Sequence, residues 1–147
     1  MAIKIPRKVL AQIISHALEE DPDECCGFLI GKGSEVIRSC RARNVHENRV
    51  SRYSMDPVQV MEIQQEADNR NERFVAIYHS HTYTQGYPSE TDINNAVDSG
   101  WTDPYYVLVS LVEKTRPVVR AYTIGDNRKV DEVVIVTDGQ AYRGASS

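Results

Sequence analysis

Residues 74–81 of the chain read Phe-Val-Ala-Ile-Tyr-His-Ser-His, and the rest of the fold can be built outward from this stretch. Its first five residues form a short, nearly continuous apolar run, which is typical of a strand buried at the centre of a sheet. His79 and His81 follow at the end of that run. Because side chains two residues apart on a strand point to the same face, the two imidazoles project together. The stretch therefore predicts a central strand that presents a pair of nitrogen ligands.

Two amphipathic helices are predicted before this strand. Pro6 is suited to the start of a helix, because its missing N–H would be unpaired there anyway. The apolar residues that follow it at helical spacing are Leu10, Ile13, Ile14, Ala17 and Leu18. Asp56 and Pro57 begin the second predicted helix, which runs to about Arg70. Its predicted buried face consists of Val58, Met61, Ile63 and Ala67.

Extended segments alternate with these helices along the chain. Strands are predicted at residues 25–30, 36–45, 105–112, 118–124 and 130–136, and a short helix is predicted to start at Ser89. A chain of 147 residues with this order of elements favours one mixed α/β domain. We assign residues 1–138 to this domain and the small, polar residues 139–147 to a flexible C-terminal tail.

The composition argues against several kinds of partner. The formal net charge of −4 disfavours nucleic acid as a general partner. No apolar run approaches the roughly 18 residues that a membrane span needs, and the N-terminal residues lack the apolar core of a signal peptide. Three cysteines without a paired pattern fit a reducing compartment. We therefore expect a cytoplasmic protein that binds neither nucleic acid nor membranes.

One basic stretch runs against the acidic balance. It contains Arg38, Arg41, Arg43, Arg49 and Arg52, with Glu47 as the only acidic residue between them. Such a stretch is either a solvated strand and loop or a docking patch for an acidic partner, and both interpretations stay open here.

The two histidines belong to a longer pattern. Ser89 and Asp92 follow them, three residues apart at the predicted helix start, so they share one face of that helix. Two imidazoles and one carboxylate give a zinc ion three ligands and leave a fourth position open, as in catalytic zinc sites. The histidine pair and the Ser89/Asp92 pair each have a simpler explanation. Ser-x-x-Asp is also a helix-capping pattern, and two histidines can stand two residues apart by chance. The combination of both halves favours the metal site.

A zinc hydrolase also needs a base. Glu24 is the candidate, because it stands at the start of the strand that begins at Cys25. The alternative for Glu24 is an exposed glutamate at the end of a helix. Glu90 and Asp98 lie near the motif, but nothing in their sequence setting indicates burial.

With these residues assembled, the chain resembles the JAMM (MPN-plus) zinc metalloproteases. The matching segments are Glu24 in Glu-Cys-Cys-Gly-Phe-Leu-Ile-Gly, His79-Ser80-His81, Pro88-Ser89-Glu90-Thr91-Asp92, Arg52–Pro57 and the strand at 106–111. The likeness covers most of residues 5–125. It implies a single MPN/JAB domain with a mixed curved sheet flanked by helices, similar to the cytidine-deaminase sandwich. It also implies one zinc ion per chain.

The resemblance implies a role for each site residue. His79, His81 and Asp92 would bind zinc, Glu24 would bind and deprotonate the catalytic water, and Ser89 would donate a hydrogen bond to the oxyanion. Thr82 departs from the family pattern, because bacterial and archaeal relatives usually have proline after the second histidine. The loop at 82–86 is therefore expected to differ in shape.

The length of the chain leaves no room for the long insertions with which eukaryotic members grip ubiquitin. The chain thus resembles the compact prokaryotic type, which includes desampylases and enzymes that process sulfur carriers. This implies a peptidase or isopeptidase that cleaves after the C-terminal Gly-Gly of a small ubiquitin-like or sulfur-carrier protein. The oligomeric state stays open, a homodimer included.

Three other functions compete with this one. A non-catalytic scaffold of the same fold would have a degraded motif, and a zinc hydrolase could act on a different amide. A cysteine-dependent enzyme using Cys25 or Cys26 would need a histidine within reach, and only His16 and His46 lie outside the zinc pattern.

Overall fold

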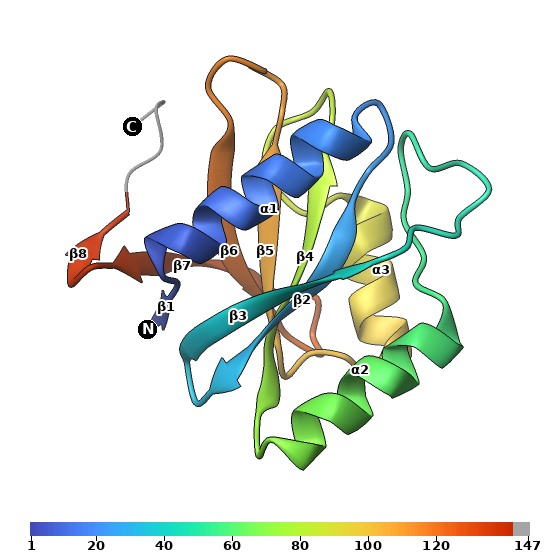
Figure 1. Ribbon diagram of the computed structural model, residues 1–147. Coiled ribbons are helices and arrows are strands. Elements are labelled where there is room, and N and C mark those ends of the chain that lie inside the picture. Colours follow the sequence, from blue (N-terminus) through green and yellow to red (C-terminus); the bar gives the residue numbers. More distant parts are fainter. Residues whose placement is uncertain (143–147) are drawn as a thin grey trace.

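The computed structural model describes residues 1–142, which form three helices and eight strands (Figure 1). In chain order these are β1 (Ala2–Lys4), α1 (Arg7–Glu20), β2 (Cys26–Lys32), β3 (Glu35–Ala42), α2 (Pro57–Asn69), β4 (Arg73–His81), α3 (Glu90–Ser99), β5 (Tyr105–Ser110), β6 (Val118–Ile124), β7 (Val130–Thr137) and β8 (Gln140–Ala141). The predicted mixed α/β class is confirmed.

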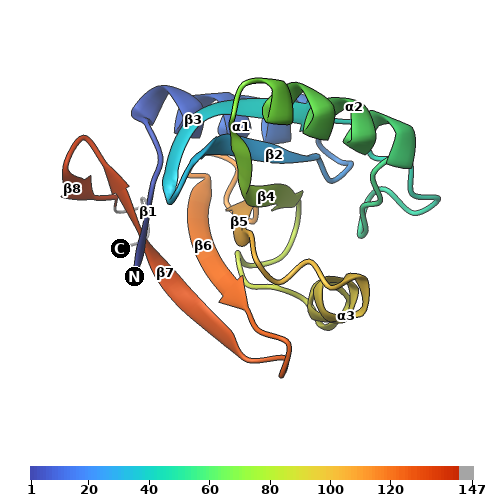
Figure 2. The same ribbon diagram turned by 90° about the horizontal axis from the view of Figure 1, so that it is seen from below.

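The strands form one mixed sheet that closes on itself. Its order is β1-β3-β2-β4-β5-β6-β7-β8, and β1 pairs in parallel with both β3 and β7. Figure 2 shows the sheet curling from β2 round to β7. The sequence predicts a curved sheet and does not indicate a strand before Pro6, so β1 and the closure of the sheet are corrections. Three residues are too short to show a hydrophobic period, which is why the sequence did not reveal β1.

Strand β4 lies at the centre, as predicted. It is antiparallel to β2 and parallel to β5, with Cys26 and Leu108 as the register partners of His79. Every residue of β4 from Phe74 to His81 is buried. The strand therefore places His79 and His81 inside the molecule, at its carboxyl end.

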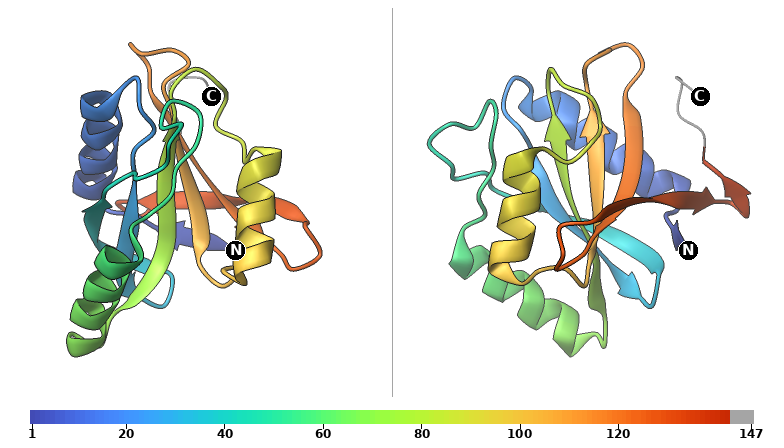
Figure 3. Two further views of the ribbon diagram at one scale, coloured as in Figure 1. Left: turned by 90° about the vertical axis from the view of Figure 1, so that its right-hand side faces the viewer. Right: turned by 180° about the vertical axis from the view of Figure 1, so that it is seen from behind.

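The helices cover the sheet on two sides. Residues of α1 pack in one apolar cluster with Leu29 and Tyr78, whereas residues of α2 and α3 join a second cluster with Phe28 and Ile77. Figure 3 shows α1 and α3 on opposite sides of the sheet. Ile77 of the second cluster lies two residues before His79 on β4, so its side chain shares one face of the strand with both histidines.

Two predicted helix faces need correction. Leu18 of α1 is 44% exposed, and Ile14 is only half-buried. In α2, Val58 and Met61 are 62% and 71% exposed. The residues of α2 that pack against the core are Val60, Ile63 and Ala67. This helix has apolar residues on two stripes, and periodicity alone does not tell which stripe faces the sheet.

The strand ends also differ from the predictions. β3 ends at Ala42 and β5 at Ser110, so each is shorter than predicted. The predicted tail begins at residue 139, but β8 pairs with β7 within it, and residues 143–147 lie outside the described residues. Within residues 1–142, no helix is long and apolar enough to cross a membrane.

Candidate metal centre

Three of the predicted site residues meet at the end of β4. The Nε2 atoms of His79 and His81 lie 3.2 Å apart. The Oδ2 atom of Asp92, from α3, lies 3.1 Å from the first and 3.0 Å from the second. All three residues are buried. Two nitrogens and one oxygen thus converge closely enough to bind a single metal ion.

The first turn of α3 holds Asp92 in this position. The backbone N–H of Asp92 donates to Ser89 Oγ at 3.0 Å, and the backbone N–H of Ser89 donates to Asp92 Oδ2 at 2.9 Å. This is a capping box, so the simpler explanation of Ser-x-x-Asp is confirmed. It is compatible with metal binding, because the same carboxylate faces the histidines. Ser89 is exposed, and since its oxygen accepts from Asp92, its own hydroxyl proton is available for donation.

The donor set suits a cation. His81 Nδ1 lies 2.8 Å from the carbonyl oxygen of Gln85, so Nδ1 bears the hydrogen and Nε2 presents a lone pair to the centre. Burial alone would raise the pKa of Asp92, but interactions with His79 and His81 hold it well below its usual range. A lone pair and an ionised carboxylate therefore point at one another, an arrangement that a positive ion stabilises.

Tyr53 covers the other histidine. Its ring stacks on His79 with the centroids 4.4 Å apart and the planes at 26°. His79 Nδ1 is buried and has no hydrogen-bond partner among residues 1–142. Stacking thus fixes the plane of the His79 ring, while His81 is oriented by a hydrogen bond. Tyr53 is not among the site residues predicted from the sequence.

Glu24 lies beside the three converging residues. Cys26 of β2 is paired with His79 of the antiparallel strand β4. The backbone N–H of Ser80 donates to the carbonyl of Cys25, so this pairing continues for one more residue. Continuing that register sets Glu24 opposite His81, and opposed residues of an antiparallel pair face the same side.

Glu24 is buried, with only 6% of its surface exposed. Burial, partly offset by the charge of His81, raises the pKa of Glu24 to about 8. A carboxyl group with a pKa near neutrality suits a general base.

Asn44 connects Glu24 to the loop between β3 and α2. Its Nδ2 donates to the carbonyls of Glu24 and Arg52, both at 2.9 Å. Its Oδ1 accepts from the backbone N–H groups of His46 and Ser54. One side chain therefore holds three backbone groups of the segment that carries Tyr53 and joins that segment to the backbone of Glu24. Nothing in the sequence distinguishes Asn44 from an ordinary loop asparagine.

Thr82 takes the place of the usual proline without disturbing the converging residues. It is buried, and its hydroxyl donates to the carbonyl of Val50 at 3.4 Å. The loop after β4 is also held by Ser110, whose hydroxyl donates to the carbonyl of Thr84 at 2.6 Å. The departure at Thr82 thus links the two loops that flank the histidines.

The cysteines do not form a second reactive centre. Cys25 and Cys26 are fully buried, and burial raises the pKa of each thiol to about 12. A nucleophilic cysteine needs a lowered pKa and access to substrate. This disfavours the cysteine-dependent alternative.

Four of the five arginines in the basic stretch pair with acidic side chains. The pairs are Arg38–Glu72, Arg41–Glu19, Arg43–Asp56 and Arg49–Asp23. Arg52 instead donates from Nη1 to the hydroxyl of Thr91, next to Asp92. These pairings favour a solvated strand and loop over a docking patch for an acidic partner.

Comparison with known proteins agrees with this geometry. Residues 6–125 match the family described as prokaryotic homologs of the JAB domain. The CysO-cysteine peptidase of Mycobacterium tuberculosis is 34% identical over 127 residues, which are 86% of this chain and 85% of that protein. The "Probable TtuB-protein conjugate cleaving protease" of Thermus thermophilus is 29% identical over 92% of this chain and 84% of its own length. A solution structure from Desulfitobacterium hafniense aligns with a TM-score of 0.80 and 26% identity, covering 95% of this chain and 94% of that one.

Proposed function

This chain belongs to the family of prokaryotic homologues of the JAB domain, and from that premise we propose that it is a zinc-dependent peptidase or isopeptidase. Its proposed substrate is a small ubiquitin-like or sulfur-carrier protein, cleaved at the bond after a C-terminal Gly-Gly. The relatives named for CysO-cysteine and for TtuB-protein conjugates support this class of substrate.

The observation that supports the proposal most is the position of Glu24 beside His79, His81 and Asp92. We propose these three residues as the ligands of one zinc ion, and their nitrogen and oxygen donors fit that metal. When bound, zinc lowers the pKa of a coordinated water to about 7 and so supplies a nucleophile at neutral pH.

The chain's own residues would then move the protons. Glu24 would take a proton from the attacking water and pass it to the leaving amine as the carbon–nitrogen bond breaks. Ser89 would donate its free hydroxyl proton to the oxyanion that develops on the carbonyl oxygen. A donor of this kind typically lowers the barrier by roughly 3–4 kcal/mol.

A groove beside His79 suits the tail of such a substrate. It has a volume of about 730 Å³ and lies between α2 and α3, with Tyr53, Met55 and Trp101 among its lining residues. Tyr53 connects this groove to His79 through their stacked rings. Glycine lets a peptide backbone approach closely, so a Gly-Gly end could reach the buried ligands from here.

Replacing Glu24 by Gln tests the proposal. Glu24→Gln should lower kcat/KM on a Gly-Gly-extended carrier protein by at least about a hundredfold, because the amide cannot accept the proton. Zinc content, measured by metal analysis, should stay at one ion per chain. Glu90→Gln is the matched control, since Glu90 is exposed on the first turn of α3, and it should retain activity.

Two results would count against the assignment. Undiminished activity of Glu24→Gln would remove Glu24 from the role of base. Purified protein without zinc would instead favour the non-catalytic scaffold.

Three further points stay predictions from the sequence. These are the cytoplasmic location, the oligomeric state and the likeness to the cytidine-deaminase sandwich.

A further inference from the structure

The two histidines of the metal centre are held in different ways. His81 donates from Nδ1 to the carbonyl of Gln85 at 2.8 Å. The Nδ1 atom of His79 is buried and has no hydrogen-bond partner among residues 1–142. A histidine that binds a metal almost always donates its second N–H to an acceptor, which fixes the plane of the ring. His79 lacks this support, so the orientation of its ring depends on another contact.

The ring of Tyr53 supplies that contact. It stacks on His79 with the centroids 4.4 Å apart and the planes at 26°. The ring of His81 meets His79 at 61°, so it does not form a second stack. Stacking on Tyr53 restrains the tilt of the His79 ring, which decides where its Nε2 lone pair points.

The backbone on both sides of Tyr53 is anchored. Asn44 donates to the carbonyl of Arg52 at 2.9 Å and accepts from the backbone N–H of Ser54 at 3.2 Å. Arg52 also donates from Nη1 to the hydroxyl of Thr91, on the first turn of α3. The Tyr53 ring is therefore presented from a fixed backbone, and it can leave the stack only by rotation of its own side chain.

Tyr53 also lines the groove of about 730 Å³ between α2 and α3. Two other lining residues share an element with a zinc-ligand candidate: Ile77 precedes His79 by two residues on β4, and Ala96 follows Asp92 by four on α3. Each pair lies on one face of its element, and the steps are about 7 Å along a strand and about 6 Å along a helix. Two residues of an extended peptide span about 7 Å as well. A Gly-Gly segment can therefore reach from the groove to the metal centre.

The side chain before Gly-Gly then lies in the groove. Met55, Val60 and Trp101 supply apolar surface there. Trp101 is itself held edge-to-face by Phe28, with the ring centroids 5.9 Å apart. An apolar side chain packed beside Tyr53 fills the space into which the tyrosine ring would otherwise rotate.

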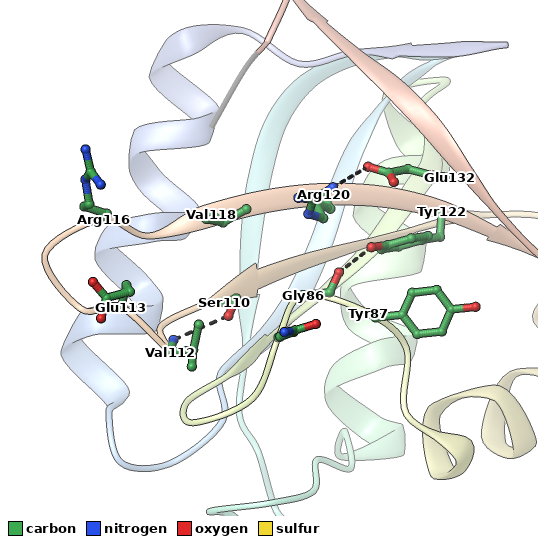
Figure 4. Close-up of a pocket in the computed structure, with 11 residues that line it drawn as sticks. Gly86, Tyr87, Ser110, Val112, Glu113, Arg116, Val118, Arg120, Tyr122 and Glu132 are labelled. Carbon is green, nitrogen blue, oxygen red and sulfur yellow. Dashed lines mark hydrogen bonds and ion pairs between the residues drawn. The ribbon is translucent and has the colours of Figure 1, made fainter. Parts of the chain in front are cut away.

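A second cavity, drawn in Figure 4, suits such a tail less well. Its volume is about 480 Å³, and residues 85–87 of the loop after β4 border it. Charged side chains of both signs line it, and Arg120 donates to Glu132 at 3.1 Å. An apolar side chain would gain little from this lining. The groove at Tyr53 is the better place for it.

We propose that Tyr53 is a positioning residue for the metal centre, and that an apolar side chain before Gly-Gly strengthens its hold on His79. The inference rests on the proposed function and adds a coupling to it. The tail in the groove keeps the Tyr53 ring stacked, and the stack keeps His79 turned towards the metal. Coupling between two binding sites is reciprocal, so bound zinc also tightens binding of the tail.

Release of zinc to a chromogenic chelator tests the positioning role. The protein is the zinc-loaded full chain with Glu24→Gln, so that no peptide is cleaved. Adding Tyr53→Leu should weaken zinc binding about ten- to a hundredfold, the usual cost of removing a group that orients a ligand. Tyr53→Phe should bind zinc as the background does, because the ring stays. Tyr87→Leu is the matched control and should leave zinc binding unchanged, since Tyr87 is 54% exposed and lines the other cavity.

Two peptides test the coupling. One is acetyl-Val-Leu-Gly-Gly-Ser-Ala carboxamide, and the other has Gly-Gly in place of Val-Leu. Both present the same groups to the metal centre, but only the first fills the groove. At saturation the first should slow zinc release from the Glu24→Gln protein at least about fivefold, and the second by less than about twofold. With Tyr53→Leu added, the two peptides should have the same effect.

Several results would overturn the proposal. These are unchanged zinc binding in Tyr53→Leu, equal effects of the two peptides on the Glu24→Gln protein, no effect of either peptide up to millimolar concentration, or a difference between them that survives Tyr53→Leu. If Tyr53→Leu does not fold, Tyr53→Met replaces it, since a flexible thioether chain also lacks a flat face.

Hydrolysis of a Gly-Gly-extended protein by the wild type tests the proposed function separately. Cleavage without the coupling would leave that function intact and remove only this inference. Coupling without cleavage would keep the role of Tyr53 and remove the peptidase activity.

Discussion

The histidines of this chain differ in role because their immediate neighbours differ. His16 in α1 is 2% exposed, and its Nδ1 lies 2.7 Å from the hydroxyl of Tyr78. Burial, reinforced by the charge of Arg41, lowers the pKa of His16 to about 4. His81 lies next to a carboxylate, and although burial alone would lower its pKa, hydrogen bonds to Asp92 and Gln85 raise it. One imidazole is therefore a neutral core group, and the other faces a site that favours positive charge.

This difference predicts how stability depends on pH. The pKa of His16 is about 6.5 in the unfolded chain and about 4 in the folded one, so between these values the unfolded chain binds more protons. The contribution of His16 is complete above about pH 6.5 and is lost as the pH falls towards 4. It amounts to about 3 kcal/mol in the free energy of unfolding.

Urea unfolding across this pH window measures the effect. His16→Gln should flatten the decline relative to the wild type, because the amide does not titrate. His46→Gln serves as the control, since His46 lies in the loop after β3 and is only half-buried. Identical pH profiles for the wild type and His16→Gln would contradict the prediction.

At the scale of elements, the loop between β3 and α2 organises much of the site. It has little regular structure, yet it supplies Tyr53 over His79 and Arg52 beside Thr91. Asn44 holds it to Glu24. The loop therefore behaves as one structural unit, although its sequence suggests only a polar connection.

Replacing Asn44 by Asp tests this unit. The change keeps the shape of the side chain but removes both N–H donors and sets a carboxylate against the carbonyls of Glu24 and Arg52. The free energy of unfolding should fall by roughly 1–3 kcal/mol. Peptidase activity should fall as well, because the backbone that carries Glu24 loses a support. Asn48→Asp, on an exposed residue of the same loop, is the control, and equal melting temperatures for the two variants would refute the role of Asn44.

At the scale of the whole molecule, closure of the sheet depends on its three-residue first strand. β1 bridges β3 and β7, and Ile3 at its middle is completely buried in the cluster beneath α1. Asp92 approaches the histidines in a similar long-range way, because α3 packs against the face on which β4 presents them. The fold thus joins segments from both ends of the described chain.

Ile3→Ala should therefore destabilise the protein strongly. We expect a loss of about 2–5 kcal/mol in the free energy of unfolding, the usual range for removing a buried isoleucine side chain. Leu18→Ala should change it by no more than about 0.5 kcal/mol, since Leu18 is 44% exposed. Urea unfolding of both variants gives the comparison. Similar losses would mean that β1 is not part of the stable core.

The central strand and the types of ligand at its end can be predicted from the sequence alone. The apolar run before His79, the spacing to Asp92 and the family-like setting of Glu24 are properties of short segments, so they can be read without contacts. The structure brings His79, His81 and Asp92 together, and it shows that Ser89 also caps α3. Their roles in binding zinc and moving protons stay proposals until they are measured.

Contacts in the folded protein decide which apolar stripe of α2 is buried, how β1 closes the sheet, and which residues support the site. Val58 and Met61 fit a helical period as well as Val60 and Ile63 do, and the choice depends on the surface that α2 meets. Asn44 has no distinguishing signal in the chain, because its hydrogen bond to the carbonyl of Glu24 joins two separate segments. Local sequence patterns specify which segments form helices or strands and which side chains could bind a metal ion. Burial, pairing and the shape of a cavity are set by contacts between residues far apart in sequence.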